Sequence, residues 1–294
     1  MDTASAPTVH LSPSPIGSRW YEKLGQLFGV DLRSLAALRI SVGTIVIADL
    51  MNRATELTAH YTDIGVLPRS ALLGQFSDGT VISLHLITGQ TWGQAILFAL
   101  AGALALAMVV GYRARLATGL SWAMMVSLHA RNQMVLDSGD ALLRMLLLWL
   151  TFLPTGAVWS LDAMARPRTL ATRPFVSVAT LGLMLQVCLV YVISALLKDA
   201  PTWANGNALF EALQLDQFAT PLGHWLLAHP GLLRVLTHWV RYLELFGPLL
   251  AFVPIFTWRI RVAIVALFWS LHAGMGLTLE LGHFPYICAA AWLA

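Results

Sequence analysis

The sequence predicts an all-α fold, a polytopic transmembrane helical bundle of about seven spans that follows an N-terminal interfacial helix. Of the 294 residues, 57% are hydrophobic and only 11% are charged, whereas soluble domains are normally about 25% charged. Apolar runs long enough to cross a bilayer recur along the chain. The charged residues gather in the connections between these runs, alternately basic and acidic. Water is therefore not the solvent for most of this surface.

Seven apolar runs match the length that a spanning helix needs, which is roughly 20 residues. They cover about 33–51, 93–111, 114–130, 140–155, 175–198, 231–254 and 262–281. The fourth run is short and follows the third after a tight polar turn, so this pair is also compatible with a re-entrant or tilted hairpin. A further apolar stretch follows Pro285. It is either the start of an eighth helix or a segment embedded in the membrane interface.

The N-terminal region divides into two parts. Residues 1–17 are rich in proline and serine and lack the charged start and apolar core of a signal peptide, which predicts a disordered tail. Residues 18–30 place Trp20, Leu24 and Phe28 on one helical face, which predicts an amphipathic helix lying on the membrane. Residues 31–294 then form the transmembrane domain.

The charges give an orientation. The basic connections alternate with acidic ones, and they carry Arg19, Lys23 and Arg33, then Arg113 and Arg115, then Arg166, Arg168 and Arg173, then Arg259 and Arg261. The positive-inside rule assigns these connections, and with them the N-terminus, to the cytoplasm. Loops 52–92, 131–139 and 199–230 are then exterior. The net charge of +3 belongs beside anionic lipid, and no basic patch with interleaved aromatic residues suggests nucleic acid.

Ionisable residues within the apolar runs need partners, because a charge at the bilayer centre costs about 2.5–3.5 kcal/mol or more. We expect Asp140 and Arg144 to pair at i,i+4. Arg39, in the middle of the first span, and Asp49, near its exterior end, are expected to form structural ion pairs as well.

Two later spans carry polar faces. Arg234, His238, Arg241 and Glu244 recur at helical spacing in the sixth span, so this face is expected to point into the bundle, with Arg241 paired to Glu244 at i,i+3. His272 lies on a similar face of the seventh span. These faces either hold the helices together or shape a pocket.

Lys198 is the residue that we single out. Only two of the 18 basic residues are lysines, Lys23 and Lys198, and Lys198 ends an apolar helix. A desolvated lysine loses its proton more readily than arginine and can then serve as a base or nucleophile. Tyr191 and Ser194 share its helical face and give the amine a polar track toward the interior. The alternative is a lysine that extends to the interface and has no chemical role.

Several strings resemble one membrane-protein family. VYVISALLKDAPTW is similar to the segment that carries the catalytic lysine of vitamin K-dependent gamma-glutamyl carboxylases. The strings LRISVGTIVIADLMNR, HYTDIGVLPRS, RNQMVLDSGDALLRMLLLW and YLELFGPLLAFVP resemble bacterial relatives of that enzyme's membrane region, the HTTM (horizontally transferred transmembrane) family. The resemblance covers most of residues 30–290 and implies a bacterial inner-membrane protein.

The resemblance implies a specific chemistry. In the carboxylase, the lysine that Lys198 matches lies on the lumenal side and deprotonates vitamin K hydroquinone, so the implied cofactor is a quinone or hydroquinone. This sequence departs from the pattern in two ways. The large lumenal domain of the carboxylase has no counterpart here. The turn at 131–140 lacks the family's histidine, although His129 lies two residues before it.

Three functions therefore compete. The first is a quinol-dependent enzyme of carboxylase-like chemistry with Lys198 as base, whose pocket is shaped by His129, Arg241, Glu244 and His272. The second is a non-catalytic accessory, maturation or anchoring subunit for an unidentified protein partner. The third, ranked lowest, is haem ligation by His238 and His272. No motif spacing predicts a metal site.

Overall fold

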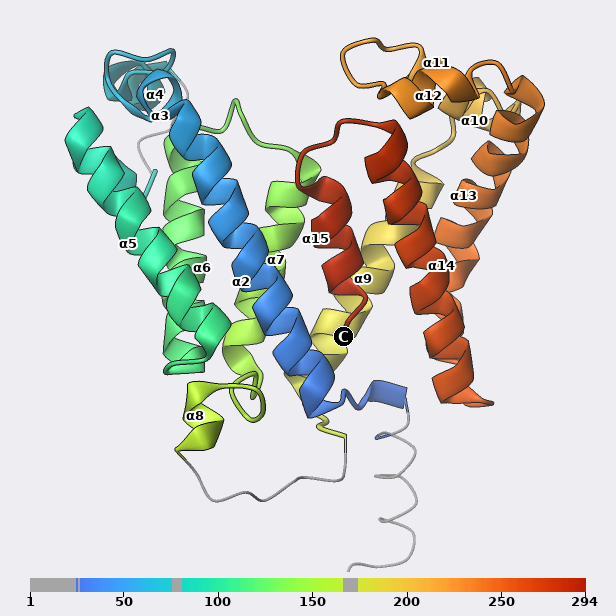
Figure 1. Cartoon of the computed structure of the whole chain (residues 1–294), viewed down its shortest axis with the longest axis horizontal. Helices are drawn as coiled ribbons and strands as arrows, with labels where there is room; N and C mark the ends of the chain where they lie inside the picture. Colours follow the sequence, from blue (N-terminus) through green and yellow to red (C-terminus); the bar gives the residue numbers. More distant parts are fainter. Residues whose placement is uncertain (1–24, 26, 76–80, 166–173) are drawn as a thin grey trace, which may run out of the picture.

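The protein is a bundle of long helices with short helices gathered at one end (Figure 1). The computed structural model describes residues 25, 27–75, 81–165 and 174–294, which form helices and two isolated β-bridges but no strand. Its long helices are α2 Leu32–Thr55, α5 Thr91–Val110, α6 Ala114–Arg131, α7 Ser138–Phe152, α9 Val178–Leu196, α13 Pro230–Leu250 and α14 Thr257–Thr278. Most of the predicted interfacial helix at 18–30 and all of the predicted tail lie outside the described residues.

The long helices form two groups joined by a short one. Helices α2, α5, α6 and α7 pack against one another, and α9 packs against α13, which in turn contacts α14. Helix α15, Phe284–Ala291, contacts α2, α7 and α14, and it lies between the groups in Figure 1. Helix α7 also contacts α9 directly. The apolar stretch after Pro285 is thus helical, and it fills the space between the two groups.

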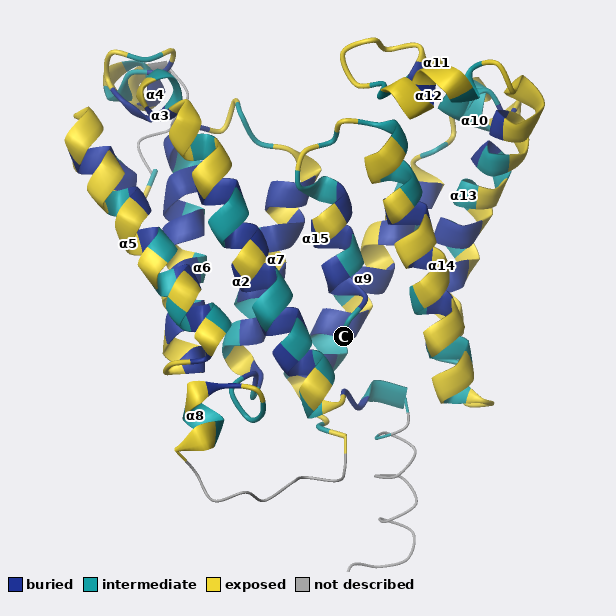
Figure 2. Cartoon of the chain, viewed as in Figure 1, coloured by how far each residue is buried: buried dark blue, intermediate teal, exposed yellow. Residues whose placement is uncertain are grey.

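In the described part of the chain, four helices are long and apolar enough to cross a membrane, namely α2, α5, α9 and α14. Their bounds lie within a few residues of four of the predicted spans. Helices α6, α7 and α13 also occur where spans were predicted, but they are not among these four. Helix α7 is short, and α6 and α13 carry charged residues. In Figure 2 exposed residues follow the outer sides of α5 and α14, and many of them are apolar, including Leu100, Leu106 and Val262. A large apolar surface of this kind indicates contact with membrane lipid.

The end of the bundle with most of the short helices is here called the capped end (top of Figure 1). One part of the cap comprises α3 Leu57–Tyr61, α4 Arg69–Gln75 and the 3₁₀ helix η1 Leu84–Leu86. The other part comprises α10 Pro201–Ala204, α11 Ala208–Leu213 and α12 Pro221–Leu226. These are the two long loops that the sequence predicts to be exterior. The opposite end carries α8 Leu161–Met164 and the starts of α6 and α14 with their arginines.

Among the described residues no carboxylate pairs with Arg39, which corrects the expected structural ion pair. Its side chain is fully buried and donates to the backbone oxygens of Met108, at 2.8 Å, and Trp159, at 2.5 Å. These carbonyls lie at the end of α5 and just before α8. Gly111 allows the approach, because it has a φ of 73° and any β-carbon there would collide with the guanidinium. Arg39 thus ties α2 to the end of α5 through backbone acceptors.

The first part of the cap is held by Asp63 and Arg69. The Arg69 guanidinium donates to both oxygens of Asp63, the shortest contact being 2.7 Å, and to the backbone oxygen of Leu86. Asp63 also donates its backbone N–H to Gly89 at 3.0 Å. From the end of α6, buried Arg131 donates to the backbone oxygens of Leu67 and Thr62. The segment is therefore fixed to the bundle through its backbone.

Replacing Arg39 by methionine should lower the free energy of unfolding by about 1–3 kcal/mol, because the Trp159 oxygen loses its buried donor. Equilibrium unfolding in mixed micelles measures this. Arg144→Met is a matched control on α7, since Arg144 is half-buried and has no polar partner among the described residues; its effect should stay within about 0.5 kcal/mol. Equal losses in the two variants would contradict the assigned role of Arg39.

Acidification should loosen the first part of the cap. The hydrogen bonds from Arg69 hold the pKa of Asp63 below its usual value. A depressed folded-state pKa contributes stability that is complete above the unfolded value, about pH 4, and is lost as pH falls through the folded value. Limited proteolysis of loop 57–92 should therefore accelerate below about pH 4. In Asp63→Asn the cleavage should already be fast at neutral pH, and a loop that stays equally resistant in this variant would refute the assignment.

Candidate functional site

Lys198 lies two residues beyond the end of α9 at the capped end. Its side chain is 15% exposed, and its Nζ donates to Ser194 Oγ at 2.9 Å. The amine also lies over the Trp203 ring of α10, 5.0 Å from the centroid. A cation–aromatic contact of this kind is attractive and shields the amine from water. The segment after α9 thus folds back so that Trp203 covers the amine of Lys198.

Glu244 is the charged partner of Lys198. It comes from α13, is 10% exposed, and accepts a short hydrogen bond from Nζ through Oε2. Ser194 Oγ lies within 3.4 Å of the same oxygen. The three side chains therefore form one polar group between α9 and α13. This geometry corrects the expected pairing of Arg241 with Glu244, because Glu244 turns toward α9 instead.

A long groove runs between α7 and α9 and ends at Lys198. Its volume is about 860 Å³. Most of its lining is apolar. Helix α7 contributes Ser138, Ala141, Leu142, Met145 and Trp149, and α15 contributes Phe284. The residues from α9 or just after it are Gly182, Leu185, Gln186, Leu189, Val190, Ile193, Ser194, Leu197 and Lys198. From residue 182 to residue 198 a helix rises roughly 24 Å. The groove is thus an extended apolar channel with a polar group at one end.

Tyr191 and His272 form a second polar contact deeper in the bundle. The Tyr191 hydroxyl lies 2.7 Å from His272 Nε2, and both residues are buried. The Tyr191 ring packs against Phe268 and against Trp292, which stack on each other with centroids 4.1 Å apart. This contact joins α9 to α14 near α15. The haem hypothesis names His238 and His272 as the two ligands. His272 contacts Tyr191, whereas His238 lies against the turn at Gly206, so the two histidines have different neighbours.

The remaining members of the predicted polar face on α13 do not enter the site. Arg234 is exposed, and Arg241 is half-buried without a polar partner in the described part of the chain. The expectation that this whole face points into the bundle was therefore wrong. Only Glu244 has its polar group inside, because Lys198 and Ser194 meet it there.

A second polar cluster lies near the capped ends of α2, α6 and α7. Arg53 is its centre, since it donates to Asp49 Oδ2 at 2.8 Å, to the Tyr61 hydroxyl at 3.1 Å and to Asp140 Oδ1 at 2.6 Å. The expected Asp140–Arg144 pair is therefore replaced by Asp140–Arg53. A capping box with Asp137 occupies the other oxygen of Asp140, so the carboxylate is fixed at the start of α7.

His129 belongs to this second cluster and not to the Lys198 group. Its Nε2 lies 3.5 Å from Asp140 Oδ1, and its side chain is fully buried. A polar cavity of about 260 Å³ borders the cluster and is lined by Asp49, Arg53, Asp140, His283 and Phe284, among others. Phe284 also lines the α7–α9 groove. The aromatic ring at the start of α15 therefore borders both cavities.

The HTTM domain family model matches residues 29–293, which is nearly the whole chain. This chain belongs to the HTTM domain family. The HTTM domain is associated with the membrane region of vitamin K-dependent carboxylases. Comparison with curated proteins and comparison with solved structures each gave no match. Together with the four apolar helices, the match shows an integral membrane protein.

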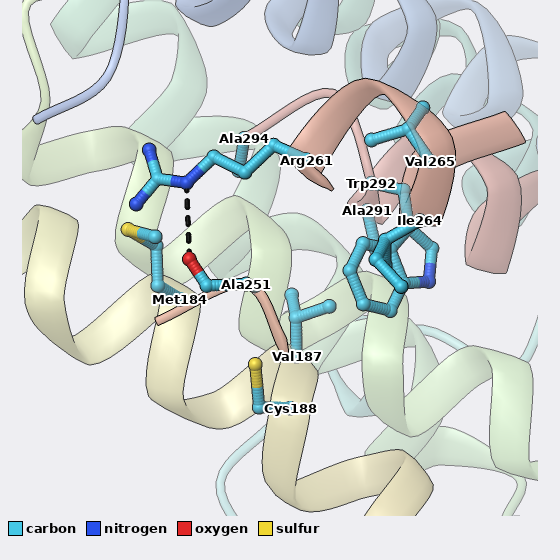
Figure 3. A pocket seen from close by; sticks show the side chains of 10 residues that line it. All are labelled: Met184, Val187, Cys188, Ala251, Arg261, Ile264, Val265, Ala291, Trp292 and Ala294. Carbon is cyan, nitrogen blue, oxygen red and sulfur yellow. Dashed lines mark hydrogen bonds between the residues drawn. The ribbon is translucent and has the colours of Figure 1, made fainter. Parts of the chain in front are cut away.

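The HTTM domain has a further enclosed cavity, toward its opposite end. Figure 3 shows this cavity between α9, α14 and α15, where Arg261 donates to the backbone oxygen of Ala251 at 3.1 Å. Its volume of about 40 Å³ is room for roughly one or two waters. Cys188 lines it as a packing residue. The cavity is too small for a prenylated ligand. A mostly apolar groove of about 990 Å³ beside the starts of α2 and α14 is large enough, but Lys198 does not line it. The α7–α9 groove is the one of these that reaches Lys198, and it is therefore the candidate binding site for a lipid-soluble molecule.

Sequence reasoning did not predict the contacts of two residues of the HTTM domain that the structure makes central, Arg53 and Trp203. Arg53 follows Asp49 by four residues, and this i,i+4 spacing was a usable signal for their contact. Trp203 follows Lys198 by five residues, but its place over the amine depends on the turn before α10. No local spacing links Lys198 to Glu244, because 46 residues separate them.

The Lys198–Glu244 contact should be energetically coupled. Removing one partner of a buried pair leaves an uncompensated charge, so Lys198→Met and Glu244→Leu should each lower the free energy of unfolding by about 3 kcal/mol. The double variant should lose less than the sum by at least about 1 kcal/mol. Equilibrium unfolding in mixed micelles gives the cycle. Strictly additive losses would show that the two side chains do not interact in the folded protein.

Proposed function

We propose that this HTTM domain is a membrane enzyme that binds a lipid-soluble hydroquinone in the α7–α9 groove and uses Lys198 as the base. The observation that carries the proposal is the apolar groove that ends at a buried lysine–carboxylate pair. An apolar pocket with a few convergent polar groups suits such a ligand. The prenyl tail would lie along α9, and the phenolic hydroxyl would face the amine.

Lys198, with Glu244 beside it, would receive the proton that the hydroquinone hydroxyl loses. In this step the lone pair of the Lys198 amine would accept the proton of the hydroquinone hydroxyl, and the Glu244 carboxylate would accept a hydrogen bond from the ammonium that forms. The products are the ammonium form of Lys198 and the hydroquinone anion. Ser194, which contacts both side chains, and Trp203, which covers the amine, hold it in position. A positioned general base of this kind typically contributes about 10²–10⁴-fold to a rate.

The proposal includes the membrane arrangement. Helices α6, α7 and α13 are taken to cross the bilayer together with the four apolar helices, giving seven crossings. Three of their charged residues are compatible with this, because Arg115 and Arg131 lie at the two ends of α6 and Glu244 of α13 is paired with Lys198. Arg144 of α7 and Arg241 of α13 have no polar partner among the described residues. The positive-inside rule then places the capped end on the exterior side of a bacterial inner membrane, with the N-terminus cytoplasmic.

One observation favours the accessory function instead. Four large apolar side chains at the capped end are strongly exposed, namely Ile64, Val66, Ile82 and Ile87. They lie on segments that the Asp63–Gly89 and Arg69–Leu86 hydrogen bonds hold together. An exposed apolar surface on a fixed segment suits a protein partner. A stably bound partner together with an indifferent Lys198 variant would support this function.

A direct test uses a reduced short-chain prenyl naphthohydroquinone and the purified chain in micelles. Tryptophan quenching measures binding, and oxygen-dependent consumption of the hydroquinone measures turnover. Lys198→Ala should lower turnover by at least about 100-fold while changing the dissociation constant little. Leu189→Trp, which fills the groove midway along α9, should weaken binding by at least about tenfold with the Lys198–Glu244 contact intact.

Two matched variants serve as controls. Leu116→Trp adds the same ring to an exposed position of α6 that lines neither cavity, and it should bind the hydroquinone normally. Arg241→Met removes a neighbouring cation of α13 that has no polar partner within the described residues, and its turnover should be unchanged. Equal binding by Leu189→Trp and wild type would exclude the groove, and full turnover in Lys198→Ala would exclude the base.

A further inference from the structure

The second polar cluster contains three groups with the chemistry of a metal site. Asp49 on α2, His129 on α6 and Asp140 on α7 each offer one ligand atom, and these atoms all lie within 4.8 Å of one another. All three residues are buried. The ligands come from three different helices, so the site would exist only in the folded bundle. The proposed quinol chemistry at Lys198 uses none of them.

His129 is the group that points to an ion. The residue is 1% exposed, and neither ring nitrogen has a hydrogen-bond partner among the residues that the structure describes. An orphaned buried nitrogen costs about 1–3 kcal/mol. Its Nε2 is 3.5 Å from Asp140 Oδ1, which is too long for a good hydrogen bond. Two ligands of one tetrahedral ion, each about 2.1 Å from the metal, are separated by roughly 3.4 Å.

We propose that Asp49, His129 and Asp140 bind a divalent transition-metal ion. Two carboxylates and one imidazole suit the zinc, manganese and ferrous ions, whereas magnesium and calcium favour oxygen ligands alone. The two carboxylates carry more negative charge than Arg53 offsets, so the site is negative before an ion binds and attracts a cation. Three protein ligands leave a further position, and the neighbouring polar cavity, which Asp49 and Asp140 also line, gives that position access to water or substrate.

Ion pairing with Arg53 is the competing explanation for the two buried carboxylates, because the guanidinium contacts both of them. An ion pair alone, however, leaves His129 without a partner. In the proposed site Arg53 keeps its bond to Asp49 Oδ2 and holds this carboxylate in place, as second-layer partners of metal ligands do. Glu56 and Asp137 line the same cavity and add negative charge that attracts cations to its mouth.

The test is a titration of the purified, untagged full chain with Co²⁺ after dialysis against a chelator. Wild type should bind one equivalent per chain and develop the visible d–d bands of a four- or five-coordinate ion, which Zn²⁺ then removes. His129→Gln and Asp49→Asn should weaken binding by at least about 100-fold. His129→Gln is decisive, since His129 has no hydrogen bond for the fold to lose.

His238→Gln and Lys198→Ala are the controls, because neither touches the cluster, and both should keep one equivalent and the same spectrum. Retention in Lys198→Ala also separates this proposal from the quinol chemistry. The proposal is overturned if folded wild type shows no stoichiometric Co²⁺ spectrum, or if His129→Gln gives the same spectrum and affinity. The wild-type spectrum decides the matter even where a variant unfolds.

Discussion

The buried contact between Lys198 and Glu244 joins two helices at the point where one of them ends. Neither side chain would have an adequate partner alone, because lipid supplies no hydrogen bonds and a buried unpaired charge is costly. α9 and α13 are therefore held in a fixed register near the capped end. The segment after Lys198 folds over the amine through Trp203. The pairing and the Trp203 contact together fix the position of the amine at the end of the α7–α9 groove.

The same constraint explains the other polar features of the bundle. Arg39 bonds to backbone oxygens at the end of α5, and Arg131 bonds to backbone oxygens in the cap. Arg53 connects α2 to α7 through Asp140 and to α3 through Tyr61. In each case a guanidinium on one helix donates hydrogen bonds to acceptors on another segment. Its several donors have a fixed geometry, so one side chain can reach more than one acceptor. His129 differs from these arginines, because neither of its ring nitrogens has a hydrogen-bond partner among the described residues.

Two cavities meet at Phe284, and they differ in chemistry. The groove along α9 is apolar and suits a lipid-soluble molecule, whereas the cavity beside Arg53 is polar and acidic. A single aromatic residue borders both, on a short helix that fills the space between the two helix groups.

The sequence alone determined the helical class and the helix positions. Hydropathy is a local property of the chain, and the bilayer thickness sets the length that an apolar helix needs to cross it. It also singled out Lys198, Tyr191 and Ser194, which share one helix face. Partner choice required the tertiary structure. Asp140 and Arg144, or Arg241 and Glu244, are close by helical spacing, yet Asp140 pairs with Arg53 and Glu244 with Lys198. Packing of α2 on α7 and of α9 on α13 brings these groups together, and no periodicity in the chain encodes contacts across 46 or 87 residues.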